Sequence, residues 1–276
     1  MPSPDTPRVP PLTPTAAACR TDVVVAHQPA FLPWLGYLAR LIDVDRLVLL
    51  DHVQYTERGW QNRNYIRGAH GQAQYLTVPV RQPFGQPIDR VRIAEDAWRA
   101  RHWRTLTQTY GRAPHWPAWQ KRLQAIYQRS WSHLIDLNEA LLQLLLDGFD
   151  LRVKLVRSST LNLSGRKSAM LVDLCRVTGA QVLRTGTGAI GYLDAGLLHR
   201  AGISVEIATY SLPLPAPAPG GVGSAAPFAG GRAIEPRTGE PVPLSALDAL
   251  LHHGPNARHL LEAGAGLQPW TAAVGS

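Results

Sequence analysis

The sequence of 276 residues contains only two cysteines, three lysines and no long uninterrupted hydrophobic run. Two cysteines are too few for the disulfide framework that stabilises many small secreted domains. Cys19 lies in a proline-rich tail, whereas Cys175 lies in an apolar helical pattern. We therefore expect Cys175 to be a reduced, buried thiol.

Residues 134–149 form the most apolar stretch, but this stretch is too short and too polar to span a membrane. Its polar interruptions are Asp136, Asn138, Glu139 and Asp147. The N-terminus also lacks the charged and apolar segments of a secretory signal. These absences predict a cytoplasmic protein that does not insert into membranes.

Several motifs with known chemistry are missing. No HExxH segment or paired CxxC is present and the histidines, including His252-His253, lack ligand spacing, so no metal site is expected. The absence of a GxSxG elbow argues against a serine hydrolase of the α/β type. The segment 185–188, Thr-Gly-Thr-Gly, is neither a Walker motif nor a GxGxxG fingerprint, and no cofactor is expected.

The net charge of +8 and the pI of about 9.9 raise the question of a nucleic-acid partner. Almost all the basic residues are arginines, which are scattered along the chain and form no basic run. No nucleic-acid-binding motif accompanies them. We therefore expect no nucleic-acid partner, whereas an anionic small substrate or a carrier phosphate is compatible with this charge.

The composition divides the chain into four regions. Residues 1–21 are rich in proline, serine, threonine and alanine and predict a disordered tail. Residues 22–210 predict an α/β core with a mostly parallel sheet, built from βαβ units at both ends of the chain, and a helical subdomain inserted at about 96–149. Residues 211–244, rich in proline, glycine and alanine, predict an irregular segment, and residues 245–276 predict a short helix and a tail.

Hydrophobic patterning predicts the elements of this core. Strands are expected at 22–27, 46–51, 74–80, 91–93, 153–158, 181–184 and 203–207. Helices are expected at 34–42, 98–110, 116–129, 132–149, 167–178 and 194–201. Ser245 is predicted to cap a last helix at 245–251, with Asp248 at the capping-box position.

Polar residues stand at the ends of the first two predicted strands. The first apolar run ends in His27 and Gln28, and the second ends in Asp51, with Gln54 close behind. Because open α/β sheets bind ligands at the carboxyl ends of their strands, these side chains are expected to face a common site. His27 is the predicted general base, the alternatives being a nucleophile or a histidine that only bonds the loop backbone. Asp51 is predicted to orient it, a cap or loop carboxylate being the alternative.

A denser polar group follows at residues 60–64. Its amides offer hydrogen-bond donors and acceptors, and its arginine offers a planar fork for a carboxylate or phosphate. We predict that this segment binds substrate through Trp60, Gln61, Asn62, Arg63 and Asn64.

Two further residues are substrate-binding candidates. His102 stands in an aromatic helical stripe and is expected to line the cleft, an aromatic core being the alternative interpretation. Thr187 stands between glycines, in a loop that is expected to contact an anion through its backbone N–H groups, with a tight turn as the alternative.

The run HQPAFLPWLGYLARLIDVDRLVLLDHVQYTERGWQNRNYIR, residues 27–67, resembles the start of the WbqC-like family. The resemblance covers roughly residues 22–255. Its later matches include Tyr75–Val80, Trp98, His102-Trp103, Tyr127, Trp131, Leu137-Asn138, Ser159, Leu161, Gly165, Lys167, Gly186, Tyr192–Asp194 and Ser245 with Asp248. Members occur in surface-polysaccharide (O-antigen) and natural-product gene clusters, so the resemblance implies a biosynthetic enzyme that modifies or conjugates an intermediate.

Two segments depart from the family pattern, Ser168–Met170 and Ser211–Pro215. If these segments contact substrate, the substrate differs from that of the polysaccharide members. The arginine-rich composition is typical of a GC-rich bacterium and makes a natural-product pathway a plausible setting.

The leading hypothesis is acyl or aminoacyl transfer, or amide or thioester bond formation or cleavage, on a carrier-bound or sugar-linked intermediate. Gln54, Asn62 and Asn64 would stabilise an oxyanion, and Arg63 would hold a carboxylate or phosphate. The expected partners are a small-molecule or carrier-bound substrate and its carrier protein.

Two other hypotheses stay open. The strand, His-Gln-Pro, helix and strand at residues 22–51 are similar to the entry of HIGH-type nucleotidylyltransferases, although Gly36 is followed by Tyr37 where a second histidine would stand. The third is a non-catalytic binding or scaffold protein of a biosynthetic complex.

Overall fold

A central sheet of six strands organises the structure, a computed structural model that describes residues 21–68, 71–81, 85–95, 97–212 and 231–270. The strands are β1 (Val23–His27), β2 (Arg46–Leu49), β7 (Lys154–Arg157), β8 (Val182–Gly186), β9 (Ser204–Tyr210) and β12 (Ala265–Pro269). Their order is β12-β9-β8-β1-β2-β7, and every neighbouring pair is parallel except β12 with β9. The predicted α/β class with a mostly parallel sheet is confirmed.

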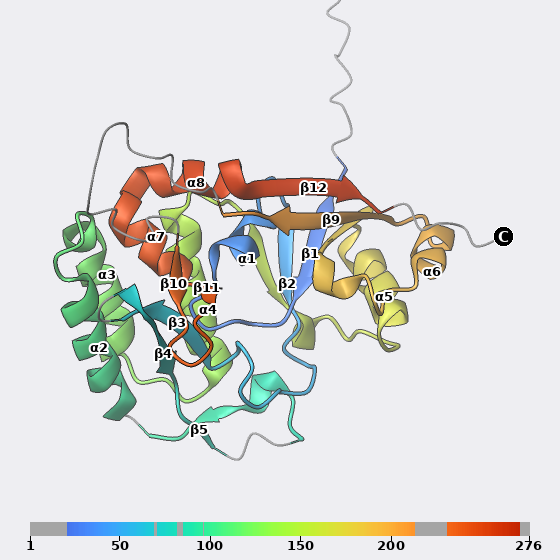
Figure 1. Ribbon diagram of the computed structural model, residues 1–276. Coiled ribbons are helices and arrows are strands. Elements are labelled where there is room, and N and C mark those ends of the chain that lie inside the picture. The colour runs from blue at the N-terminus through green and yellow to red at the C-terminus, as the bar shows by residue number, and fades with distance from the viewer. Residues whose placement is uncertain (1–20, 69–70, 82–84, 96, 213–230, 271–276) are drawn as a thin grey trace, which may run out of the picture.

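Helices cover both faces of the sheet (Figure 1). One face packs against α1 (Leu35–Ala39), α4 (Leu134–Gly148), α7 (Ala246–His253) and α8 (Ala257–Gly264). The other face packs against α5 (Ser168–Thr178) and α6 (Ala195–Arg200). Successive strand side chains point to opposite faces, so Leu47 and Leu49 of β2 enter the first core and Val48 enters the second.

The chain changes direction between β1 and β8. From β1 it passes through α1 to β2 and then to β7, and from β8 it passes through α6 to β9 on the other side. The two connections therefore leave neighbouring strands in opposite directions and on opposite faces. In open α/β sheets this arrangement opens a crevice at the carboxyl ends of the two strands.

The connection between β2 and β7 contains the helical insertion expected in the middle of the chain. It begins with two hairpins, β3 (Arg63–Arg67) with β4 (Ala73–Thr77), and β5 (Val80–Arg81) with β6 (Arg92–Ile93). Helices α2 (Ala97–Tyr110) and α3 (Trp116–Gln128) follow and precede α4. The strand predicted at 74–80 is two strands in the structure, and Pro79, which has no N–H to donate, stands at the break.

The described part of the C-terminal region differs from expectation. A hairpin of β10 (Arg232–Ile234) and β11 (Pro241–Pro243) lies within the segment 211–244 that was expected to be irregular. Helix α8 and strand β12 lie where a tail was expected after residue 251. Strands β11 and β12 contain proline or glycine, so their sequences carry little strand propensity, and pairing with β10 and β9 respectively stabilises them. Residues 1–20 and 213–230, on which the other expectations for the tail and irregular segment fall, lie outside the described residues.

An ion pair between Arg67 and Asp248 joins the β3–β4 hairpin to α7. Arg67 Nε lies 2.9 Å from Asp248 Oδ1 and Nη2 lies 2.7 Å from Oδ2, a bidentate geometry. The Asp248 side chain is only 2% exposed. Ser245 caps α7 as predicted, accepting a hydrogen bond from Leu247 N at 3.2 Å. Asp248, expected in the capping box, instead holds Arg67.

Asp248→Asn should lower the free energy of unfolding by about 3 kcal/mol, because it leaves the guanidinium of Arg67 without its carboxylate partner in a largely buried position. Urea denaturation measures the change. The matched control is Glu95→Gln, which breaks an exposed pair with Arg101 and should cost less than about 0.5 kcal/mol. Equal losses for the two variants would contradict the prediction.

Candidate functional site

A cavity of about 380 Å³ opens at the carboxyl ends of β1 and β8, where the direction of the chain changes. His27 and Gln28 reach it from β1, and Thr185 and Gly186 reach it from β8. The remaining lining residues are Ala26, Arg40, Leu50, Gly188, Ala189 and Tyr192. None of these lining residues is acidic, so the cavity contains one arginine and no carboxylate.

The loop after β1 is held in place by side-chain amides. Asn64 Nδ2 donates to the carbonyl oxygens of Phe31 at 3.2 Å and Leu32 at 2.8 Å. Leu32 has a φ of +44°, a left-handed conformation that is unfavourable for a residue with a side chain. The buried Asn64 therefore stabilises a strained turn, and this turn fixes the path of the chain directly after His27 and Gln28.

His27 is half-buried, and its ring has one defined tautomer. Nδ1 lies 2.8 Å from the carbonyl oxygen of Gln28, which only accepts hydrogen bonds. Nδ1 therefore carries the proton, and Nε2 keeps its lone pair. Burial, together with the nearby Arg40 guanidinium, lowers the pKa of His27 to about 4, so the ring is neutral at pH 7. An edge-to-face contact with Tyr37, at 4.7 Å between ring centroids, also restrains the ring.

Gln28 presents a hydrogen-bond donor beside His27. Its Oε1 accepts from Gln61 Nε2 at 2.7 Å, which fixes the orientation of the amide. The Gln28 NH₂ group makes no hydrogen bond to the described residues and belongs to a side chain that lines the cavity. Two consecutive residues of the cavity lining, His27 and Gln28, therefore carry an unprotonated imidazole nitrogen and an amide donor.

Arg40 caps the C-terminus of α1 and supplies the positive charge of the cavity. Its Nε is buried and has no hydrogen-bond partner. Burial lowers the pKa of its guanidinium. Sequence reasoning missed Arg40, although it is the one charged residue in the otherwise apolar run 29–42. An arginine within a short apolar helix was the available signal.

Asp51 is buried, and its carboxylate makes no hydrogen bond to His27 in the described residues. Within the described residues its carboxylate accepts hydrogen bonds from Ser158 Oγ at 2.9 Å, Ser159 N at 2.8 Å and Ser159 Oγ at 2.8 Å. These serines belong to η3 (Ser158–Thr160), directly after β7. Asp51 follows β2, which lies between β1 and β7 in the sheet. Its side chain bonds the serines after β7. The structure thus does not bring Asp51 and His27 together as the expected pair.

His52 also contacts Ser158, at 2.5 Å between Nδ1 and Oγ. An aspartate, a serine and a histidine within one hydrogen-bonded group suggest a catalytic triad. Here the serine lies between the other two, and it is only 2% exposed. The group therefore ties β2 to β7 and does not present a nucleophile.

The polar segment at 61–64 is mainly internal scaffolding. Asn62 Nδ2 donates to the Val78 carbonyl at 2.9 Å, and the Gln61 carbonyl accepts from Asn138 Nδ2 at 2.8 Å. Arg63 donates to the Arg58 carbonyl and lies over the Tyr75 ring, 4.5 Å from its centroid. Of this segment, only Gln61 contacts a residue of the cavity, through its hydrogen bond to Gln28.

The other predicted substrate-binding residues lie in three different places. Gln54 and Trp60 are on the surface, and Trp60 is 52% exposed. Thr187 is exposed and begins η4 (Thr187–Ala189), between the cavity residues Gly186 and Gly188. His102 is buried against Trp98 and Tyr127, and its Nε2 lies 2.9 Å from the Thr77 carbonyl. His102 therefore belongs to an aromatic core, which was the alternative interpretation. Burial lowers the pKa of His102 to about 4.

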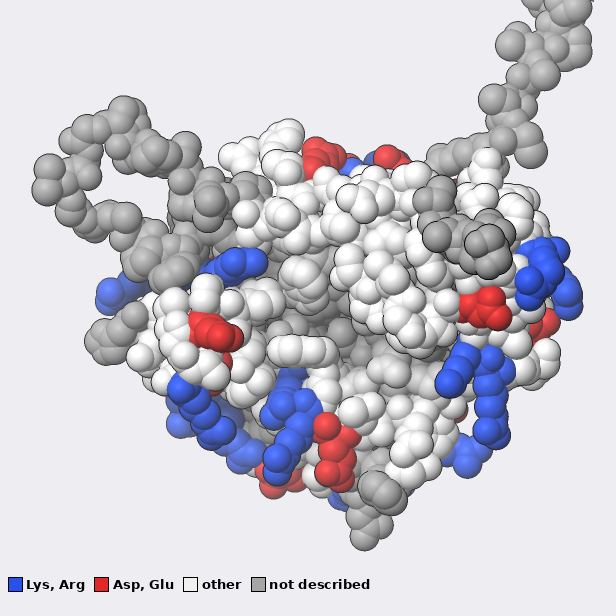
Figure 2. Space-filling view, turned by 45° about the vertical axis from the view of Figure 1, so that its right-hand side comes forward, with Lys and Arg blue, Asp and Glu red and all other residues white. Residues whose placement is uncertain are grey.

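Charged side chains are dispersed on the face shown in Figure 2. Lysines and arginines form separate groups around its margin, with acidic side chains beside them, and its hollowed middle is largely uncharged. The net charge of +8 thus does not form a continuous basic surface on this face.

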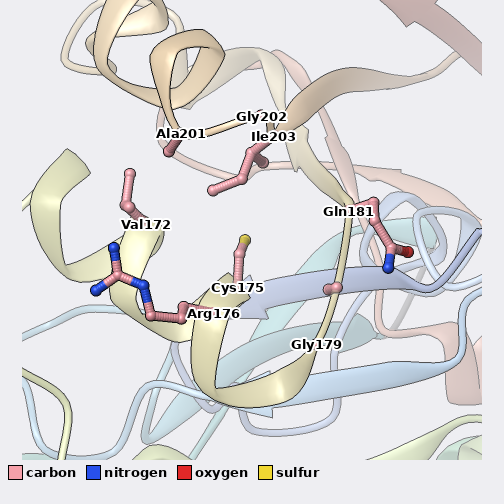
Figure 3. A pocket seen from close by; sticks show the side chains of 9 residues that line it. Val172, Cys175, Arg176, Gly179, Gln181, Ala201, Gly202 and Ile203 are labelled. Carbon is pink, nitrogen blue, oxygen red and sulfur yellow. The ribbon is translucent and has the colours of Figure 1, made fainter.

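A second cavity, of about 290 Å³, lies at the opposite edge of the sheet. Gln181 and Ile203, which directly precede β8 and β9, line it together with Cys175 of α5 (Figure 3). Figure 3 shows the Cys175 thiol directed into this space. Burial raises the pKa of the Cys175 thiol to about 12, so it is protonated and unreactive at neutral pH. This cavity lies at the amino ends of the strands and lacks the basic nitrogen found at the other edge.

Two further observations concern only the part of the chain that the structure describes. No cluster of three or more His, Cys, Asp or Glu side chains is arranged there to hold a metal ion. No helix there has the length and apolarity needed to cross a membrane.

Comparison with known proteins places these features in a family. A sequence model described as the WbqC-like protein family matches residues 28–216, a range that includes all the cavity residues except Ala26 and His27. The uncharacterized protein Rv1507c of Mycobacterium tuberculosis is 32% identical over 185 residues, which cover 66% of this chain and 80% of that protein. No solved structure shows significant similarity to the chain.

Arg40→Gln should raise the pKa of His27 from about 4 toward the 6.5 of a free imidazole, because it removes a positive charge that disfavours protonation. Asp51→Asn should leave the pKa of His27 unchanged, because no hydrogen bond joins the two side chains. NMR titration of the imidazole resonances measures both, and the ¹⁵N shifts should report the Nδ1–H tautomer. A pKa that responds to Asp51→Asn and not to Arg40→Gln would contradict this electrostatic account.

Proposed function

The chain belongs to the WbqC-like protein family, and on this premise we propose that it is a biosynthetic enzyme that transfers an acyl or aminoacyl group. Its substrate would be a small-molecule or carrier-bound intermediate of a natural-product or surface-polysaccharide pathway. The observation that carries the proposal is His27, which lines the cavity at the carboxyl edge of the sheet. Its Nδ1–H donates to the Gln28 carbonyl, and its Nε2 makes no hydrogen bond to the described residues.

The proposed step is attack of an acceptor amine on an acyl thioester held in the cavity. The amine nitrogen bonds to the carbonyl carbon, and His27 Nε2 takes the proton that the nitrogen loses. The Gln28 NH₂ group donates to the carbonyl oxygen as negative charge develops on it. The carbon–sulfur bond then breaks, and the departing sulfur receives the proton from His27.

The low pKa of His27 is compatible with this step. A base of pKa about 4 is neutral and therefore ready to accept a proton at pH 7. An amine that has attacked a carbonyl becomes an ammonium that is more acidic than that of the free amine, so a weaker base can remove its proton. A deprotonation that precedes attack, as for a hydroxyl nucleophile, would need a stronger base.

Nucleotidyl transfer is a second candidate, favoured by one observation. The parallel strands follow the order β7-β2-β1-β8-β9, which corresponds to the order 3-2-1-4-5 of nucleotide-binding sheets. Gly36-Tyr37 lacks the second histidine of HIGH-type enzymes, and acyl transfer therefore remains the leading proposal.

His27→Gln should reduce turnover by about 10²–10⁴-fold, because it removes the proton acceptor while leaving a polar side chain of similar size. The assay follows thiol release from a panel of acyl and aminoacyl N-acetylcysteamine thioesters with amine acceptors. Mass spectrometry identifies the amide that is formed. Release of pyrophosphate from ATP or CTP is measured in parallel.

The matched control is His259→Gln, at a histidine that is 80% exposed on α8, and it should keep full turnover. Thioester turnover that survives His27→Gln would refute the role of His27. Pyrophosphate release without thiol release would replace acyl transfer by nucleotidyl transfer.

A further inference from the structure

Arg40 is a cation without a counter-ion in the described part of the chain. Its guanidinium forms no ion pair and no hydrogen bond there, and its Nε is buried without a partner. Arg184, which donates to the Arg40 and Ile42 carbonyls in the same turn, is paired with Glu206 at 2.8 Å. Because a buried charge without a partner is costly, the fold maintains Arg40 in a position that destabilises the protein alone.

The surroundings of Arg40 match an anionic ligand. Arg40 lines the same cavity as His27 and Gln28, and none of the lining residues is acidic. Arg40 Nε is buried, so the groups open to a ligand are the two terminal nitrogens, whose N–H groups form a planar fork for two oxygens of a carboxylate or phosphate. The described residues provide these donors but no acceptor for them, and a ligand could supply the acceptor oxygens.

The absence of a side chain at Gly186 leaves room for the Arg40 guanidinium. A Cβ at this position would lie 2.5 Å from Arg40 Nη2 and 3.0 Å from Cζ. The backbone at Gly186 has a φ of −95°, which any residue adopts, so the glycine is required for space and not for conformation. The Arg40 head group can therefore pack against the backbone of the turn after β8.

We propose that Arg40 and the Gly186 turn form an oxyanion subsite, which holds a phosphate or carboxylate group of the substrate beside His27. This inference rests on the proposed function in one respect only, that the cavity receives a substrate. It adds that the substrate is anionic, as a phosphopantetheine-type carrier group or a free carboxylic acid would be.

Anion binding at Arg40 would also change His27. The groups that face the His27 ring or share its cavity are Tyr37 from α1, Arg40 at the end of α1, the Gln28 carbonyl and Tyr192. Arg40 is the cation among them, so an anion bound to Arg40 offsets the charge that disfavours protonation of His27. The substrate would then raise the basicity of the residue that acts on it.

The experiment measures anion binding without turnover. The dependence of Tm on ligand concentration gives Kd for sodium phosphate, pyrophosphate, acetate and succinate, with sodium chloride at equal ionic strength as the reference. Arg40→Gln should weaken binding at least tenfold. Gly186→Ala, which displaces the guanidinium but keeps its charge, should weaken binding in the same direction.

Two control variants match these changes. Arg176→Gln removes one positive charge at the second cavity, on the opposite edge of the sheet. Gly191→Ala adds a methyl group in the same loop region as Gly186, where a Cβ meets no atom within 4 Å. Both should bind anions as the wild-type protein does. In the absence of anions, Arg40→Gln should have a Tm equal to or above that of the wild type, because the substitution removes an unpaired charge that is partly buried.

The outcomes separate the alternatives. Loss of binding in Arg40→Gln and Gly186→Ala, with a rise in the His27 pKa on adding anion to the wild type, supports the subsite. A preference for phosphates or for carboxylates then names the substrate group. No binding in the wild type, or equal binding in Arg40→Gln, overturns the subsite.

The subsite and the acyl transfer can fail separately. Anion binding lost with Arg40 but no thioester turnover would retain the subsite and refute the reaction. Thioester turnover that depends on His27, with no anion binding at Arg40, would retain the reaction and refute the subsite.

Discussion

The candidate site depends on the hydrogen bonds by which two side-chain amides fix the loop after β1. Asn64 binds two carbonyls of this loop, and Gln61 fixes the amide of Gln28. Both amides come from one segment, which α4 anchors through Asn138 and the Gln61 carbonyl. These bonds offset the cost of the left-handed backbone of Leu32 and help to fix the path of the chain beyond His27. The polar segment at residues 61–64 thus supports the residues that line the cavity and does not itself line it.

The cavity combines two electrostatic features that are compatible with a ligand site. A neutral histidine and an unpaired arginine lie in a partly desolvated space that contains no carboxylate. The arginine lowers the stability of the free protein because it has no counter-ion there, whereas the low pKa of His27 lowers stability only below about pH 6.5, where an unfolded histidine binds a proton. Two other largely buried arginines are paired with carboxylates, Arg67 with Asp248 and Arg184 with Glu206. Local unfavourable electrostatics within an otherwise well-paired fold are typical of functional sites.

The sequence allowed the sheet and part of the site to be predicted, because both follow from local patterns. Apolar runs that end in polar residues predicted β1 and β2 and placed His27 and Gln28 at the carboxyl edge of the sheet. The role of Asp51 depends on Ser158 and Ser159, more than 100 residues away, and no local pattern encodes that contact. Arg40 was missed for a similar reason, since its lack of a partner is a property of the folded surroundings. Strands β11 and β12 were missed because they contain proline or glycine and are stabilised by pairing and not by propensity.

The composition of the loop after β1 explains why a side chain would have to recognise an anion here. Dinucleotide-binding sheets place a glycine-rich turn after their first strand, and its backbone N–H groups cradle the phosphates. In this chain the corresponding turn contains Pro29 and Pro33, which have no N–H, and Phe31 N is bonded to the Trp60 carbonyl at 2.9 Å. The loop therefore offers few backbone donors to a phosphate. With the first turn rigid and poor in donors, the charge for an anion has to come from the end of α1, where Arg40 stands, and the space has to come from the turn after β8, where Gly186 stands. The same strand order that elsewhere binds nucleotides through backbone atoms is thus suited here to a smaller anionic group held by a guanidinium.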